Sequence, residues 1–442
     1  MENRKTAIEI FLTGVESVKP DNLINRFVSM EKNILRLENM TYDLSATGNI
    51  YIVGMGKASA IMARAIESVL GKRITAGHVI TKYGHSAPLK YTGVTEAGHP
   101  VPDENGIRGT EQILSIVNKA GKDDLVICLI SGGGSALQVD VPQGCTLEDL
   151  KRLNSILLKS GADITELNCI RKHISKVKGG QLAKSAYPAK IVSLILSDVI
   201  GDPLEAIASG PTAPDPTTFA DAISILRKYN VENEIPEKIY RVLQEGFYNK
   251  RPETLKVSDK VFRNTSNFII GNNSLALKTA KEKAEFFGYE TKIISNKIDG
   301  DISDVADYIV EKTMDINKSS PDRNCCLLFS GEPTVKVSGT GSGGRNQHLA
   351  LLSAKLLGGM QGITFLSGGT DGTDGPTDAA GAVIDQFTLP NARDLGLDIE
   401  KYLNDFDSYN FFKKEGGLII TGPTQTNVMD LMVVLINQSS LN

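Results

Sequence analysis

The sequence predicts an α/β protein of two three-layer α/β/α domains, with mainly parallel sheets and an active-site cleft between them. The chain has 442 residues, which is more than one hydrophobic core usually organises. Short apolar runs typical of buried strands alternate with amphipathic helical patterns. In both halves glycine, serine and aspartate follow these runs directly, at the sheet edge where α/β proteins bind ligands.

The composition is that of an ordinary globular protein, with 41% hydrophobic and 23% charged residues and a formal net charge of -4. This charge provides no basic surface, so we expect no nucleic-acid partner. No apolar run is long enough to cross a bilayer and the start of the chain lacks a signal-peptide pattern, so we expect a cytoplasmic protein without a membrane partner. The five cysteines and five histidines lack zinc-binding spacing, which argues against a zinc enzyme.

Residues 1 to about 45 are predicted to form covering helices, because Ile8, Phe11, Leu12 and Val15 follow helical spacing. The first predicted strand comes next, at residues 50–53. It is the start of the alternating strand and helix pattern.

A glycine turn with Lys57 follows that first strand and leads into an amphipathic helix over residues 60–70. Such a turn attracts anions through free backbone N–H groups and the helix dipole. It is not a dinucleotide fingerprint, because Ser59 takes the third glycine position and no acid follows the next strand. Nor is it a P-loop, because Tyr51 replaces the first glycine and Ala58 follows the lysine. Lys57 is a candidate ligand for a carboxylate or phosphate, and a solvent-exposed lysine explains the sequence equally well.

The clearest buried strand, at residues 125–130, ends in three glycines flanked by serines. Backbone N–H groups in such a run can cup anionic oxygens. The candidate binding residues are Ser131, Gly132, Gly133, Gly134 and Ser135.

Three further side chains of this half lie in or beside the motifs and could belong to a site. Arg171 lies on the charged face of a predicted helix over residues 166–178; we expect that face to be solvated, with Arg171 as the exception. Asp198 follows the strand at residues 191–196, where a carboxylate can bind Mg²⁺ or accept a proton. His99 precedes a proline in residues 96–103, which are predicted to form a rigid loop, and it is interpreted as structural.

A polar stretch over residues 229–266 interrupts the alternating pattern and predicts the domain boundary. Residues 1–250 are predicted to form a Rossmann-like α/β domain with glycine-rich anion-binding loops. Residues 251–442 are predicted to form a second α/β domain.

Two stretches of the second domain carry candidate residues. Gly343 and Gly344 precede Arg345 and Asn346 at a predicted helix start, where an arginine is unfavourable to the helix dipole and so indicates a bound carboxylate or phosphate. The loop after residues 363–366 places carboxylates beside hydroxyls, a pattern suited to a divalent cation or to Asx-turns that bind only their own backbone. These carboxylates are Asp371, Asp374 and Asp378.

Seven motifs follow one another along the chain: Gly54-Met-Gly-Lys57-Ala-Ser, Ser131-Gly-Gly-Gly-Ser135-Ala-Leu, Asn168-Cys-Ile-Arg171-Lys-His, Ser197-Asp-Val-Ile-Gly-Asp202, Ala208-Ser-Gly-Pro-Thr212, Gly343-Gly-Arg-Asn-Gln347 and Asp371-Gly-Thr-Asp-Gly-Pro-Thr-Asp378-Ala-Ala-Gly. As a set they resemble the type II glycerate kinases, whose C-terminal part is the MOFRL domain. The resemblance runs from about residue 7 to residue 436.

The resemblance implies phosphorylation of D-glycerate with ATP and Mg²⁺, commonly at the 2-hydroxyl, in an interdomain cleft lined by Lys57 and Arg345. We expect Asp198 or one of the three loop carboxylates to hold Mg²⁺ or to accept the hydroxyl proton; the sequence does not separate these roles. The chain departs from the family pattern at three positions, which are Ser330, His348 and Gln425.

Two other functions stay open. A nicotinamide-dependent reductase acting on hydroxypyruvate would use the first glycine turn for its cofactor, although the acid that binds the ribose is missing. A non-catalytic two-domain receptor would close on a small anion without turnover. The sequence also leaves open the phosphorylated hydroxyl, the preferred nucleotide and the oligomeric state, including a homo-oligomer.

Overall fold

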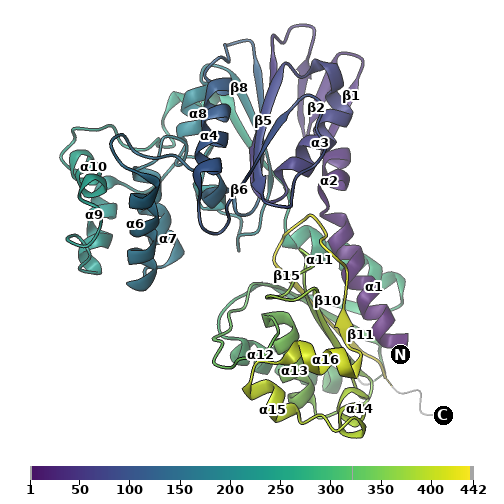
Figure 1. Cartoon of the computed structure of the whole chain (residues 1–442). Helices are drawn as coiled ribbons and strands as arrows, with labels where there is room; N and C mark the ends of the chain where they lie inside the picture. The colour runs from purple at the N-terminus through teal and green to yellow at the C-terminus, as the bar shows by residue number, and fades with distance from the viewer. Residues whose placement is uncertain (1, 321, 439–442) are drawn as a thin grey trace. The chain divides into compact units, whose positions relative to one another are not determined.

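The computed structural model describes residues 2–320 and 322–438 and confirms the α/β class (Figure 1). The chain divides into two compact units. The N-terminal unit is Leu23–Ile270, and the C-terminal unit joins the residues up to Asn22 to those from Gly271 onward. None of the helices in the described part of the chain is long and apolar enough to span a membrane.

These bounds differ from the predicted boundary at residue 250 for two reasons. Strand β9 (Thr265–Gly271) is the last strand of the first sheet, although the sequence pattern placed it in the second domain. Helix α1 (Glu2–Ser17) packs on α11 (Asn273–Phe286) and on the sheet of the C-terminal unit. Arg4 fixes it there through ion pairs of 2.8 Å with Asp385 and with Glu415.

The sheet of the N-terminal unit has the strand order β6-β5-β4-β7-β8-β9. Its first five strands in this order pair in parallel, as predicted. They are β4 (Ile50–Met55), β5 (Ala76–Lys82), β6 (Gly93–Ala97), β7 (Leu125–Ile130) and β8 (Lys190–Leu196). The chain runs outward from β4 to β6 and then returns to place β7 on the other side of β4. The order therefore reverses between β4 and β7, and the carboxyl ends of strands at such a reversal are where open α/β sheets bind ligands.

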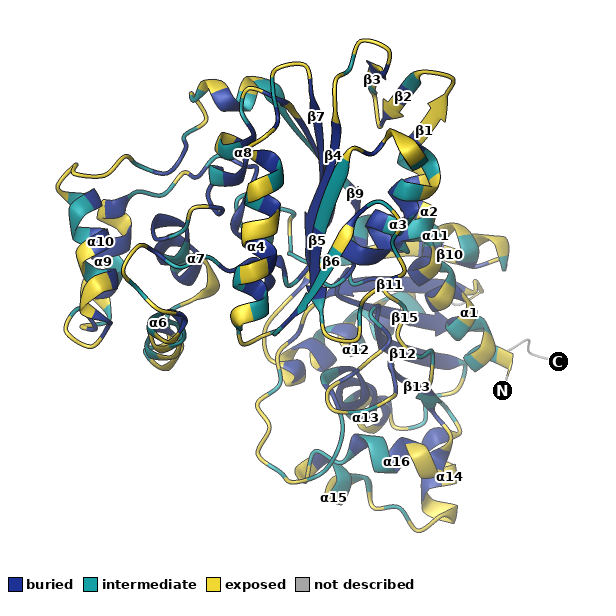
Figure 2. Ribbon diagram, turned by 45° about the horizontal axis from the view of Figure 1, so that its top comes forward, coloured by how far each residue is buried: buried dark blue, intermediate teal, exposed yellow. Residues whose placement is uncertain are grey.

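Helices cover both faces of this sheet (Figure 2). Helix α3 (Ser59–Leu70) packs on β4, β5 and β7, while α4 (Glu104–Val117) and α8 (Gln181–Ala186) pack on the face that carries Tyr51, Val53 and Met55. A separate cluster of helices has its own apolar core, which includes Leu153, Leu157 and Ile170. These helices are α6 (Leu147–Lys159), α7 (Ile164–His173), α9 (Phe219–Lys228) and α10 (Glu237–Phe247).

The prediction of helices up to residue 45 is right for α1 and α2 (Pro20–Phe27) and wrong beyond them. A three-stranded antiparallel sheet follows, made of β1 (Val28–Glu31), β2 (Ile34–Leu37) and β3 (Met40–Asp43). In β2 the buried Leu35 and Leu37 alternate with the exposed Arg36, which is strand periodicity. Two-residue connections join these strands, too short for another helix.

The sheet of the C-terminal unit has the order β10-β11-β15-β12-β13-β14 and is mixed, where the sequence predicted a mainly parallel sheet. Among the described strands of this sheet, only β10 and β11 pair in parallel. The described residues 370–380, between β12 and β13, contain no helix, and parallel neighbours need a crossover connection. The strands are β10 (Glu290–Ile298), β11 (Cys325–Gly331), β12 (Ile363–Gly369), β13 (Gly381–Asp385), β14 (Leu418–Ile419) and β15 (Asp430–Ile436).

Helices lie on both faces of this second sheet as well. α1 and α11 pack on one face, and α12 (Ile302–Ser319) and α13 (Arg345–Leu357) pack on the face that carries Phe329, Phe365 and Met432. Three shorter helices near the C-terminus adjoin α13: α14 (Thr388–Asp394), α15 (Ile399–Asn404) and α16 (Ser408–Glu415). Because β15 runs against β11 and β12, its first residue lies at the carboxyl end of both strands.

Candidate active site

The two glycine turns predicted to bind anions interlock at the point where the strand order reverses. Ser131 donates its backbone N–H to the carbonyl of Met55 at 3.0 Å, and Lys57 donates its N–H to the carbonyl of Gly132 at 2.9 Å. The hydroxyl of Ser131 accepts the N–H of Ala58 at 3.0 Å. Gly56 has a φ of 122° and a side chain there would collide with Ser131, so only glycine allows this approach. Lys57 and the loop of residues 131–135 therefore belong to one site.

Asp198 joins this site from the neighbouring strand β8. A side chain on Gly132 would collide with the Asp198 carboxylate, so the carboxylate lies directly against the backbone of the glycine run. Asp198 is only partly buried and can meet a ligand from solvent. The prediction that a carboxylate stands at the end of this strand beside the anion loop is consistent with this geometry.

His99, which the sequence interpretation set aside as structural, also lies beside the glycine run. Its Nε2 would be 2.8 Å from a β-carbon on Gly133, and Lys57 Cγ would be 3.4 Å from the same point. Burial lowers the pKa of His99 to about 4, and the charges of Lys57, Lys82 and His85 add to this shift. The imidazole of His99 is thus neutral at neutral pH, and it lies near the basic side chains of Lys57, Lys82 and His85. Its position at the end of β6, a strand that the sequence interpretation treated as loop, was the missed signal.

A strained turn at Ala208 and Ser209 packs against the end of the glycine run. Ala208 and Ser209 have φ values of 51° and 60°, in the left-handed region that non-glycine residues rarely adopt. The hydroxyl of Ser209 lies 2.7 Å from that of Ser135 and donates to the side chain of Asn168 at 3.1 Å. The Ala208 methyl leaves no room for a side chain at Gly134. The turn therefore fixes Ser135 and the end of the run.

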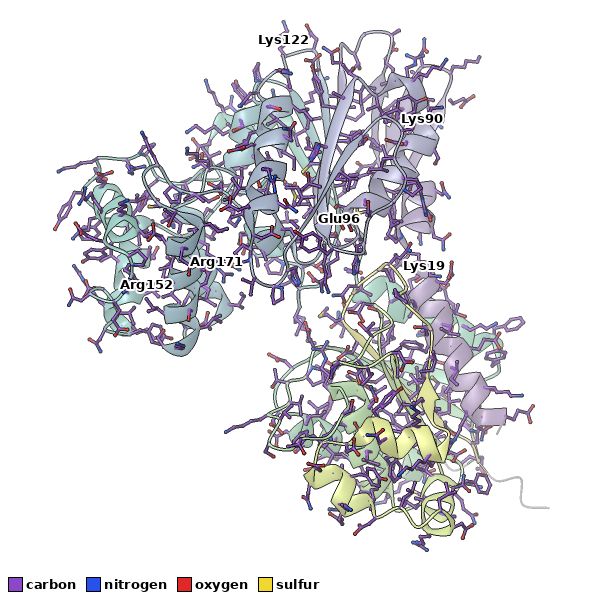
Figure 3. All side chains as sticks on the ribbon, viewed as in Figure 1. Lys19, Lys90, Glu96, Lys122, Arg152 and Arg171 are labelled. Atoms are coloured by element: carbon purple, nitrogen blue, oxygen red, sulfur yellow. The ribbon has the colours of Figure 1, made fainter. Side chains whose placement is uncertain are left out.

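The predicted polar face around Arg171 is buried, not solvated. Lys172 is 4% exposed and forms a 2.6 Å ion pair with Asp215. Arg171 donates from Nε to the side chain of Asn154 at 2.9 Å, and burial lowers its pKa. Figure 3 labels Arg171 in the cluster of helices that includes α6 and α7. Arg171 lines a cavity of about 300 Å³, which Gly133, Ser135 and His99 also line.

In the C-terminal unit Arg345 is held by two carboxylates at the start of α13. Its Nε and Nη2 donate to Asp430 at 2.6 and 3.1 Å, and its Nη1 donates to Glu332 at 2.8 Å. Burial alone would lower the pKa of Arg345, but the charges and hydrogen bonds of Asp430 and Glu332 outweigh it and raise the pKa. The protein's own carboxylates compensate the charge of Arg345, so its place at the helix start does not by itself indicate a bound anion, and anion binding by Arg345 stays a prediction. Three of its five N–H donors are engaged by these bonds.

Asp430 was missed by the sequence interpretation. It is the first residue of β15, stands opposite both Gly331 and Gly369, and is 1% exposed. The available signal was a single acid directly before an apolar run of six residues. That signal was hidden because the antiparallel direction of β15, which brings its first residue to the site edge, was not predicted.

Asp374 caps helix α13 from a distant loop. Its carboxylate accepts the backbone N–H groups of Asn346 and Gln347 at 3.0 and 2.8 Å, and the Gln347 side chain at 3.0 Å. Burial raises the pKa of Asp374 to about 6 despite these bonds. A side chain on Gly344 would collide with it, which explains the glycine before Arg345. Asp374 thus positions Asn346 and the start of the helix that carries Arg345.

The other loop carboxylates make separate contacts. Asp371 accepts the backbone N–H of Thr373 at 3.1 Å in an Asx-turn, and Asp378 accepts the hydroxyl of Tyr409 at 2.8 Å. Across residues 2–320 and 322–438, no group of three or more His, Cys, Asp or Glu side chains is arranged to hold a metal ion. The structure therefore does not gather the predicted carboxylates into a cluster, and metal binding by any one of them stays a prediction.

The chain is similar to known proteins over nearly its whole length. The chain matches a domain of unknown function, DUF4147, over residues 6–244 and the MOFRL family over residues 325–430. It is 42% identical over 436 residues to a D-glycerate 2-kinase of Thermotoga maritima, covering 98% of each chain. A crystal structure of glycerate kinase from the same organism superposes with a TM-score of 0.87 at 41% identity, covering 98% of this chain and 99% of that one. A protein of Agrobacterium vitis, named only provisionally as a hydroxypyruvate reductase, is 41% identical over 393 residues, or 88% of this chain and 87% of that protein.

Proposed function

The chain belongs to the glycerate kinase family that carries a MOFRL domain, and on this basis we propose that it transfers the γ-phosphoryl group of ATP to the 2-hydroxyl of D-glycerate. The observation that carries the proposal is the full-length likeness to D-glycerate 2-kinase, and the two hydrogen-bonded glycine turns at the strand-order reversal support it. In the reaction the substrate oxygen bonds to the γ-phosphorus, the bond from that phosphorus to the bridging oxygen of ADP breaks, and the hydroxyl proton passes to a base.

The N-terminal unit supplies donors for the phosphates and a carboxylate beside them. The run from Gly132 to Gly134 offers backbone N–H groups, and Lys57 offers an ammonium group at the same turn. Charge spreads over the phosphoryl oxygens in the transition state, so donors that are already in place stabilise it without reorganisation.

Asp198 is the residue that best fits either a metal ligand or the base. Mg²⁺ in kinases is commonly held by one or two carboxylates together with substrate phosphates. The carboxylate of Asp198 lies against the backbone of the predicted phosphate loop, which fits that requirement. When bound, Mg²⁺ would neutralise charge on the phosphate oxygens; without a cation at that carboxylate, Asp198 is placed to accept the hydroxyl proton.

Arg345 is proposed as the anion-binding side chain of the C-terminal unit. Asp430 and Glu332 hold its guanidinium in one orientation, and its remaining N–H donors can bind a carboxylate or phosphoryl oxygen. Gly343 and Gly344 precede it, and their missing side chains leave room for Ser408 and Asp374, which pack against this turn. Because Asp430 and Glu332 compensate its charge, Arg345 contributes directed hydrogen bonds more than net positive charge.

The nicotinamide-dependent alternative is weaker on structural grounds. A dinucleotide site needs an acid after the second strand to bind the ribose hydroxyls, but β5 ends at Lys82. A lysine there suits a phosphate better than a neutral ribose. No feature of the site favours hydride transfer over phosphoryl transfer.

Phosphorus NMR of the reaction product tests the proposal. The chain is incubated with ATP, Mg²⁺ and D-glycerate, with EDTA replacing Mg²⁺ in a control. A phosphate on the 2-oxygen couples to one proton and gives a doublet, whereas a phosphate on the 3-oxygen couples to two and gives a triplet. We expect a doublet that disappears with EDTA; a triplet would contradict 2-phosphorylation, and no new ester would contradict the kinase.

A further inference from the structure

The cavity beside Arg171 has an apolar half. Leu150, Leu153 and Leu158 of α6 line it together with Val139 and Ile174. Its volume of about 300 Å³ is at the lower end of the range for small-molecule sites, which combine apolar walls with a few polar groups. D-glycerate has three carbons, each with an oxygen, so it offers nothing to match such walls.

The other half of the cavity is polar and reaches the glycine run. Gly133, Ser135 and His99 line it, and these residues belong to the anion site described above. One ligand can therefore have its apolar end between the leucines and its anionic end on the backbone of the run. The cavity therefore adjoins the predicted phosphate loop within the N-terminal unit.

Two cations also line the cavity. Lys178 is 6% exposed and donates to the carbonyl of Gln138 at 2.6 Å, and its burial lowers its pKa to about 8. Arg171 has the neutral side chain of Asn154 as its hydrogen-bond partner. The single carboxylate in the lining, Asp140, accepts from Ser175 and from the backbone of Lys176. Two cations and one anion leave a net positive charge, which suits a phosphate.

We propose that this cavity binds the nucleoside part of ATP, with the base against the leucines of α6 and the phosphate next to the ribose on Arg171 and Lys178. From there the phosphate chain continues to Gly133 and Ser135. This inference rests on the proposed kinase function, and it assigns the nucleotide to the N-terminal unit. It gives Lys178, which sequence analysis did not single out, a role in binding.

Two variants probe the two ends of the cavity separately. Leu158→Glu puts a carboxylate at the apolar end, and the 62% exposure of Leu158 means that the change does not disturb the core. Ile164→Glu is the matched control, because Ile164 is 63% exposed in the same helical cluster and does not line the cavity. Arg171→Gln removes the cation at the polar end.

Isothermal titration of each full-length variant with ADP, and separately with adenosine, tests the assignment. We expect Leu158→Glu to weaken both ligands by about tenfold or more, because it places an unpaired charge against the base. We expect Arg171→Gln to weaken ADP by about tenfold and adenosine by less than about twofold, because only ADP carries the phosphate. Ile164→Glu should match the unmodified protein.

Three results would overturn the inference: unchanged ADP affinity in Leu158→Glu, an equal loss of ADP and adenosine in Arg171→Gln, or an effect of Leu158→Glu confined to the KM for D-glycerate. The last result would assign the cavity to the acceptor. The titrations use no turnover, so a failure of the kinase proposal, seen as no product with D-glycerate, is distinguished from a failure of the nucleotide assignment.

Discussion

The two units provide positive groups in opposite ways. In the N-terminal unit a parallel sheet brings Lys57, Lys82 and His85 near His99, whose pKa is lowered first by burial and further by the charges of these three residues. In the C-terminal unit an antiparallel strand brings Asp430 to the corresponding sheet edge, where it holds Arg345 in an ion pair. On the proposed function, the first arrangement would attract an anion, and the second would orient the hydrogen-bond donors of Arg345. The comparison teaches that the role of a basic side chain in a loop depends on its partners. A cation without a carboxylate partner can attract a ligand by its charge, whereas a cation paired with a carboxylate mainly presents hydrogen-bond donors in a fixed orientation.

The ion pair in the C-terminal unit gives the largest expected effect. Asp430→Ala leaves Arg345 without its buried partner, and we expect a loss of about 3 kcal/mol in the free energy of unfolding, at the low end for buried pairs because Arg345 is 31% exposed. Urea denaturation of the full chain measures this loss. Glu332→Gln is the control: Glu332 is 48% exposed, so the loss should be below about 1 kcal/mol. Equal losses in the two variants would remove the contrast between Asp430 and Glu332.

A variant of Lys57 tests the basic sheet edge of the N-terminal unit. We expect Lys57→Ala to lower turnover by about 100- to 1,000-fold, as removal of one charge-stabilising donor does, with an almost unchanged melting temperature. The rate of ADP release and a thermal melt measure the two quantities. The exposed Lys72→Ala is the control and should keep normal turnover. A variant of Lys57 with near-normal turnover would exclude this lysine from the site.

The buried cap Asp374 predicts a pH effect in the C-terminal unit. Burial raises its pKa from 3.8 to about 6, so the folded state binds the proton more tightly than the unfolded chain. Its contribution to stability is therefore fully present below about pH 4 and is lost as the pH rises through about 6. Relative to Asp374→Asn, the unmodified chain should lose about 2 kcal/mol between these pH values in urea denaturation. A difference between the two that stays constant with pH would refute the raised pKa.

The strained turn of the N-terminal unit gives the smallest effect. Ala208 has a φ of 51°, which glycine adopts without a steric penalty, so we expect Ala208→Gly to stabilise the chain by about 0.5–1 kcal/mol. Turnover should fall modestly, because the missing methyl no longer supports Gly134. A decrease in stability would mean that the contact of this methyl outweighs the strain.

Sequence reasoning predicted most of the N-terminal site, because strand, glycine and helix follow one another locally at β4 and β7. Local pattern also indicated Asp198 at the end of β8. His99 was missed because the strand before it was read as loop, and Lys178 because its burial depends on packing between distant segments. A sequence pattern carries information about local strands and turns, but not about packing between distant segments.

The C-terminal site was less predictable for a reason of topology. Its key residue, Asp430, begins a strand that runs opposite to its neighbours, whereas the sequence pattern suggested parallel strands. The cap that Asp374 forms on α13 was not predicted, because the loop that carries Asp374 folds back on a helix start 28 residues earlier. Both omissions concern where a residue lies in space, and metal binding by Asp374 stays a prediction.

The most direct test of the proposed function is the release of ADP from ATP and Mg²⁺, measured with and without D-glycerate, beside an assay of NADH oxidation with hydroxypyruvate. The account predicts ADP release that requires both D-glycerate and Mg²⁺, and no oxidation of NADH. Consumption of NADH without ADP release would contradict it and would mean that the glycine turns at β4 and β7 hold a dinucleotide.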